Sequence, residues 1–86
     1  MSMVTGEQIK MARAALGWSI EKLAEASSVG VRTINRMEAQ NGFPNATQAN
    51  LRLIRSTLEE AGIEFIGDAT EGPGVRLWSQ ASSQTN

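Results

Sequence analysis

The sequence contains no cysteine and no histidine. Without cysteine, disulfides and thiolate chemistry are excluded, which fits a reducing cytoplasm. Without histidine, the commonest general base and metal ligand are missing. No pair of carboxylates lies where the sequence predicts a pocket. We therefore expect no enzymatic activity, no metal site and no cofactor.

Long apolar runs are also missing, since no stretch approaches the roughly 18 apolar residues of a membrane span. The first residues lack a basic start followed by an apolar run, so we expect no signal peptide. The apolar content of 41% is ordinary for a globular domain. We expect one small cytoplasmic domain of 86 residues with no membrane contact. So short a chain buries only a modest core, and burial in an oligomer would add to it.

The net charge of −1 conceals an uneven distribution along the chain. Residues 1–58 hold seven basic and four acidic residues, a net of +3. Residues 59–86 hold one basic and five acidic residues, a net of −4. This split indicates a basic functional half followed by an acidic segment. The negative total therefore does not exclude binding to a nucleic acid. The acidic residues lack the fixed spacing of metal ligands.

The first 30 residues or so predict two short helices. Thr5 and Gln8 form a capping-box pattern at the start of a helix over 6–16, and Gly17 is placed to end it. Ser19 is a suitable N-cap for a second helix, which runs out at Ser27 and Ser28.

A third helix is expected from Gly30 or Val31 to about Gln40, with Ile34 and Met37 on its inward side. Val31 can belong either to that inward side or to the exposed surface. Asn41-Gly42 and Pro44 are turn signals that follow it.

Asn45 is a plausible N-cap for a fourth helix up to Ala61, which is alternatively two shorter helices broken near Ala49. Residues 63–66 and 75–78 are β-type runs joined by a long glycine-containing loop. The pattern predicts a mainly α domain of four to five helices over 5–61, a β-hairpin within 62–78 and a polar tail over 79–86.

The segment from Ile20 to Glu38 is typical of two helices that cross at a tight turn. Ala24 supplies the small residue at the crossing, and apolar residues fix the angle between the helices (Leu23, Val29, Ile34 and Met37). The outward side of the second helix carries Arg32, Thr33, Asn35 and Arg36. Arg32 and Arg36 are four residues apart and share a face, so they can present two guanidinium groups to guanine edges in a DNA groove.

Residues 5 to about 61 resemble the Cro/repressor-type (Xre) helix-turn-helix transcriptional regulators. The resemblance runs through MARAALGWS at 11–19, LAEAS at 23–27 and VRTINRME at 31–38. Residues 63–66 and 72–77 also look like the ending of one small bacterial subgroup. The resemblance implies a lambda-repressor-like fold and a sequence-specific regulator that binds double-stranded DNA.

The resemblance also implies which residues contact DNA. Val31, Arg32 and Arg36 occupy the base-reading positions, and Thr33 and Asn35 flank them. Contacts to the DNA backbone are expected from Ser19 at the start of the second helix and from Gln40 and Asn41 in the loop after the third. Ile20 stands where the family usually has a phosphate-binding glutamine, which weakens one of these contacts.

Two further features follow from the resemblance. Arg13 and Glu38 occupy the positions of a buried structural ion pair, so Arg13 is not expected to contact DNA. The turn has Ser28 and Gly30 where the family commonly has glycine and then a serine N-cap. Ser28 would then adopt a left-handed backbone at a cost of roughly 1 kcal/mol.

A single module of this size makes few DNA contacts, so we expect a homodimer on an inverted repeat. An isolated two-stranded hairpin is marginal in water, which suggests that the hairpin packs against a second subunit. The expected dimer contact comprises Leu53, Thr57, Phe65, Ile66, Leu77 and Trp78. The alternative is a protein-binding module of the antitoxin or anti-activator type that uses the C-terminal strands.

Overall fold

A computed structural model describes residues 4–39, 46–68 and 70–78 of the chain. The elements are α1 (Gly6–Leu16), α2 (Ile20–Ser27), α3 (Val31–Glu38), α4 (Gln48–Glu60), β1 (Ile63–Ile66) and β2 (Gly74–Leu77). The expected mainly α fold with a C-terminal hairpin is therefore confirmed, with four helices in the described part of the chain.

Local sequence signals fix both ends of α1 as expected. The Thr5 hydroxyl accepts a hydrogen bond from the Gln8 amide at 3.1 Å, and the Gln8 side-chain oxygen accepts one from the Thr5 amide at 3.0 Å. Gly17 ends the helix in the left-handed conformation, with φ of 70°. The capping box and the C-terminal glycine are therefore both confirmed.

Three expected boundaries need correction. Helix α4 begins at Gln48, since Thr47 is its N-cap and accepts a hydrogen bond from the Asn50 amide at 3.1 Å. The predicted N-cap, Asn45, lies outside the described residues, and α4 is one continuous helix through Ala49. Helix α3 ends at Glu38 and not near Gln40. The second strand covers 74–77 and not 75–78.

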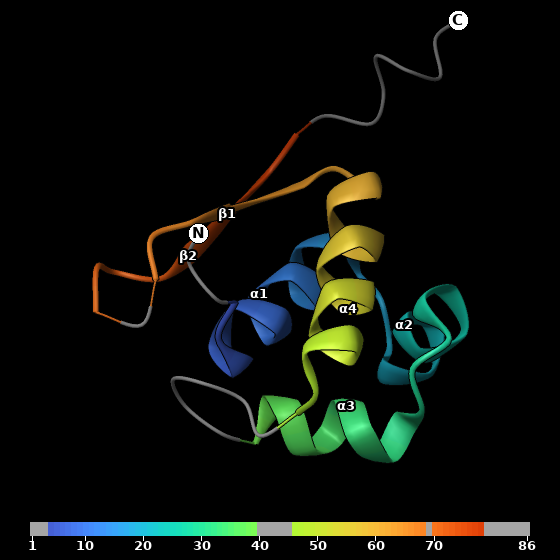
Figure 1. Ribbon diagram of the computed structural model, residues 1–86. Coiled ribbons are helices and arrows are strands. Elements are labelled where there is room, and N and C mark those ends of the chain that lie inside the picture. The colour runs from blue at the N-terminus through green and yellow to red at the C-terminus, as the bar shows by residue number, and fades with distance from the viewer. Residues whose placement is uncertain (1–3, 40–45, 69, 79–86) are drawn as a thin grey trace, which may run out of the picture.

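The core lies between the helices and one face of the hairpin. It consists of Val4, Ile9, Ala12, Leu23, Val29, Ile34, Met37, Leu51, Ile54, Leu58 and Ile63. Figure 1 shows the hairpin at one end of the molecule, α1 and α4 in the middle, and α3 at the other end. The side of α3 that faces away from the core is consequently also far from the hairpin.

The hairpin is packed against its own chain. Its strands are antiparallel, and Ile63 pairs with Leu77, Glu64 with Arg76 and Phe65 with Val75. Ile63 is buried, and Phe65 and Val75 pack against the core. Contacts with α1 and α4 thus supply the burial that a free hairpin lacks. This packing removes the stability argument for a second subunit, although Ile66, Leu77 and Trp78 remain exposed.

Gln8 connects the start of α1 to the hairpin. While its oxygen completes the capping box, its side-chain nitrogen donates to the carbonyl oxygens of Ile66 at 2.9 Å and Gly74 at 3.0 Å. Ile66 and Gly74 are paired at the loop end of the sheet. One buried side chain therefore fixes both strands on the helix that it caps.

A Gln8→Glu substitution separates these two roles. Glutamate at this position still completes a capping box, but a carboxylate cannot donate to the two carbonyl groups. We expect the free energy of unfolding in urea to fall by about 1–3 kcal/mol, because two partly buried carbonyls lose a donor. Amide exchange should accelerate in the hairpin more than in α2 and α3. An unchanged urea midpoint would show that the contact does not stabilise the hairpin.

Candidate DNA-binding site

The helix-turn-helix consists of α2, the turn over 28–30 and α3. Ser28 has φ of 65° and is the one residue other than glycine with positive φ in the described part of the chain. Its amide donates to the Ala24 carbonyl at 2.9 Å, and the buried Ser27 hydroxyl accepts from the Val29 amide at 3.2 Å. The left-handed backbone expected at Ser28 is therefore confirmed, and it directs the chain from α2 into α3.

Gly30 is the N-cap of α3 and forms no side-chain cap. By contrast, Thr5, Ser19 and Thr47 each accept a hydrogen bond from the first turn of their helices. A β-carbon added at Gly30 would meet no atom within 4 Å. The first turn of α3 therefore has no side-chain cap, and there is open space beside Gly30.

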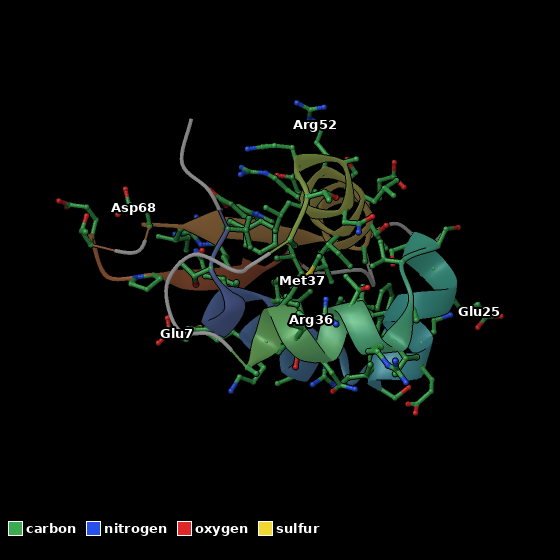
Figure 2. All side chains as sticks on the ribbon, turned by 60° about the horizontal axis from the view of Figure 1, so that its bottom comes forward. Glu7, Glu25, Arg36, Met37, Arg52 and Asp68 are labelled. Carbon is green, nitrogen blue, oxygen red and sulfur yellow. The ribbon has the colours of Figure 1, made fainter. Side chains whose placement is uncertain are left out.

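Helix α3 has two sharply different sides. Ile34 and Met37 are fully buried, and Glu38 is buried beside them. Arg32, Asn35 and Arg36 are exposed, and Thr33 is partly buried. Val31 is 37% exposed, so of the two alternatives for this residue the inward side is wrong and the exposed surface holds. In Figure 2, Arg36 lies on the outer side of α3 and Met37 points toward the core.

The exposed side of α3 is positively charged. Neither Arg32 nor Arg36 forms an ion pair with any residue that the structure describes. The helix's one acidic residue, Glu38, is neutralised by Arg13. Glu7 and Glu25 lie toward opposite sides of this view of the molecule, on α1 and α2 (Figure 2). The exposed face of α3 therefore presents two unpaired guanidinium groups.

Arg13 and Glu38 form a bidentate ion pair between α1 and the last turn of α3. The two nitrogen–oxygen distances are 2.7 and 2.8 Å, and Arg13 also donates to the Trp18 carbonyl at 3.0 Å. The hydrogen bonds that the Arg13 guanidinium donates to the Glu38 carboxylate raise the pKa of Arg13 above its usual value. The structure thus brings together the two residues expected to pair, and it directs Arg13 away from the exposed side of α3.

The start of α2 differs from the arrangement that the resemblance to the Cro/repressor-type regulators implies. Ser19 is exposed, and its hydroxyl accepts from the Lys22 amide at 2.9 Å. Ile20 packs against the core together with Trp18. The Lys22 ammonium lies 5.5 Å from the centre of the Trp18 ring, within the range of a cation–π contact. The side chain of Ser19 is therefore engaged as a helix cap.

The other residues predicted to contact DNA or a second subunit lie partly outside the described ranges and partly on α4 and the hairpin. Gln40 and Asn41 lie outside the described residues. Leu53 is 44% exposed on α4, and Thr57 and Phe65 are partly buried. The anchoring of the hairpin by Gln8 was not predicted from the sequence. The one available signal was a glutamine at a capping-box position where glutamate serves equally well.

Comparison with known families identifies the fold. A family model described as Helix-turn-helix matches residues 9–61, which is more than half of the chain. The chain belongs to this family and is a helix-turn-helix protein of the Cro/Xre type. It is accordingly a DNA-binding protein of the transcription-regulator kind. A search of curated proteins found no match. No helix among the described residues is long and apolar enough to cross a membrane.

The strain at Ser28 can be measured. Ser28→Gly should raise the free energy of unfolding by about 1 kcal/mol, because glycine adopts a left-handed backbone without a β-carbon penalty. Ser28→Ala is the matched control, since it keeps the β-carbon and should change stability by less than about 0.5 kcal/mol. Urea unfolding of the three proteins tests this, and equal midpoints for the glycine and alanine variants would contradict it.

Proposed function

We propose that this protein is a bacterial, cytoplasmic regulator of transcription that binds an inverted-repeat operator as a homodimer. Val31, Arg32 and Arg36 read base edges in the major groove. Thr33 and Asn35 contact bases or phosphates beside them, and Ser19, Gln40 and Asn41 lie against the DNA backbone. The observation that carries the proposal is that Arg32 and Arg36 are exposed on α3 and that neither forms an ion pair with a described residue.

The chemistry of this face supports base reading. The guanidinium group has a planar fork of donors that matches the two acceptors of guanine in the major groove. Val31, at the first position of α3, is exposed enough for contact with a thymine methyl group. The open start of α3 at Gly30 allows close approach of DNA.

A two-fold dimer would double these contacts. Half-sites about one helical turn apart, on the order of 34 Å, would receive the two copies of α3. The surface assigned to the dimer comprises Leu53, Thr57, Phe65, Ile66, Leu77 and Trp78. Of these, Leu53, Ile66, Leu77 and Trp78 are exposed in the single chain.

Arginine substitutions test the base-reading role. Arg32→Ala and Arg36→Ala should each weaken binding to an operator selected from random DNA by about 1–3 kcal/mol, because each removes a bidentate contact. Arg52→Ala is the control, since Arg52 is an exposed arginine on α4 and lies away from α3 (Figure 2). Fluorescence anisotropy gives the affinities, and affinity should fall steeply with salt.

Binding equal to the parent in both α3 variants would overturn the assignment of α3. Selection that enriches no sequence would instead favour the alternative, a protein-interaction module of the antitoxin or anti-activator type.

The oligomeric state tests the second part of the proposal. Light scattering after size exclusion should give twice the chain mass of 9.3 kDa at micromolar concentration. A protein that is monomeric under these conditions, yet binds a palindromic operator tightly, would contradict the homodimer.

A further inference from the structure

Within the described ranges of the chain, the outer edge of β2 has no hydrogen-bonding partner. The Trp78 amide donates to the Gly62 carbonyl at 2.8 Å, so the register that pairs Glu64 with Arg76 continues to Trp78. Since successive residues of an antiparallel strand alternate in direction, the backbone groups of Val75 and Leu77 point away from β1. Their amides have no acceptor among the residues that the structure describes.

The two edges of the hairpin differ in the side chains that accompany them. On β1, the outward-pointing backbone belongs to Ile63, which is 3% exposed, and to Phe65, which lies beneath the Arg55 guanidinium. On β2, the edge ends in Leu77 at 42% exposure and Trp78 at 57%. Exposed apolar residues beside a free strand edge favour pairing with another strand. The β2 edge is therefore the better candidate.

The exposed Trp78 is held in a fixed position. Its ring nitrogen donates to the Glu64 carboxylate at 2.9 Å, and the same oxygen accepts from Arg76 at 3.1 Å. The Arg76 guanidinium lies 5.6 Å from the centre of the Trp78 ring. An exposed aromatic side chain whose conformation is already restricted loses little entropy when a partner covers it.

From these contacts we propose that two copies of this chain join through their β2 edges into a continuous four-stranded antiparallel sheet with the two-fold axis at Leu77. This inference rests on the proposed homodimer and names its contact.

An axis at Arg76 would place two arginines directly opposite each other, which is destabilising. An axis at Val75 would leave Leu77 and Trp78 outside the core of the contact. An axis at Leu77 buries both copies of that side chain and places Arg76 opposite the partner's Trp78, a favourable cation–π pair.

This arrangement also suits the position of α3. Two antiparallel strands that pair at their edges are related by a two-fold axis perpendicular to the sheet. The core-facing side of the hairpin therefore points in the same direction in both copies. Since α3 and the hairpin lie at opposite ends of the molecule, both copies of α3 then face the same way (Figure 1). Stacking the outer faces of two hairpins would instead point them in opposite directions. Edge pairing is thus compatible with one DNA duplex, and stacking is not.

Single-cysteine crosslinking tests the register, because the chain has no cysteine of its own. Leu77→Cys should form a disulfide-linked dimer under mild oxidation, since the β-carbons of directly opposed residues lie about 5 Å apart, close to the roughly 4 Å that a disulfide needs. Ile66→Cys is the matched control, because Ile66 is similarly exposed at 37% but lies at the far end of the hairpin. We expect it to crosslink several-fold more slowly.

A third single-cysteine variant, Leu53→Cys, distinguishes failure of the edge contact from failure of the proposed homodimer. Efficient crosslinking of Leu53→Cys, with none of Leu77→Cys, would overturn the edge pairing and leave a homodimer formed through α4. Equal rates for all three variants would also overturn it, because such rates indicate random collision. Selection of an operator by the parent protein is scored independently, so failure of DNA binding is distinguishable from failure of the edge contact.

Leu77→Pro provides a readout without oxidation. Proline removes the outward amide of Leu77 and leaves the amides of Arg76 and Trp78, which point toward β1, in place. We expect the variant to keep the circular dichroism spectrum of the parent and to become monomeric in light scattering. A folded Leu77→Pro protein that remains dimeric would overturn the proposal.

Discussion

The ion pair between Arg13 and Glu38 fixes the last turn of α3 against α1. It joins α1 to the last turn of α3, and Arg13 simultaneously binds the carbonyl of Trp18, just before α2. One guanidinium group on α1 therefore contacts both the end of α3 and the turn between α1 and α2. A buried ion pair contributes little net stability, because desolvation offsets much of the attraction. Its main consequence here is geometric, since a bidentate pair accepts only a narrow range of orientations.

The pairing of Glu38 with Arg13 also determines the charge of the exposed face of α3. Glu38 is the acidic residue of α3, and its pairing with Arg13 leaves Arg32 and Arg36 as the unpaired charges of the helix within the described part of the chain. The local field is thus positive although the chain as a whole carries −1. DNA binding depends on this local field, which explains how a slightly acidic protein can belong to a DNA-binding family.

The turn that leads into α3 contains local backbone strain. Ser28 holds a left-handed conformation, and Gly30 leaves the start of α3 without a side-chain cap. At the other end of the molecule, Gln8 uses one amide group to cap α1 and to fix the hairpin. The helix-turn-helix and the hairpin are therefore held by separate contacts to α1.

The sequence by itself determined the helices and the faces of the helix-turn-helix, because caps, turns and apolar spacing act over three or four residues. Thr5, Gln8, Gly17 and Ser19 mark their helix ends without tertiary information. The tertiary structure decided the features that depend on distant contacts. It placed Val31 on the surface, where neither periodicity nor composition distinguished core from exposure. It also packed the hairpin against α1 and α4 and fixed it to α1 through Gln8. The two carbonyl acceptors of Gln8 lie 58 and 66 positions further along the chain, so no local pattern encodes this contact.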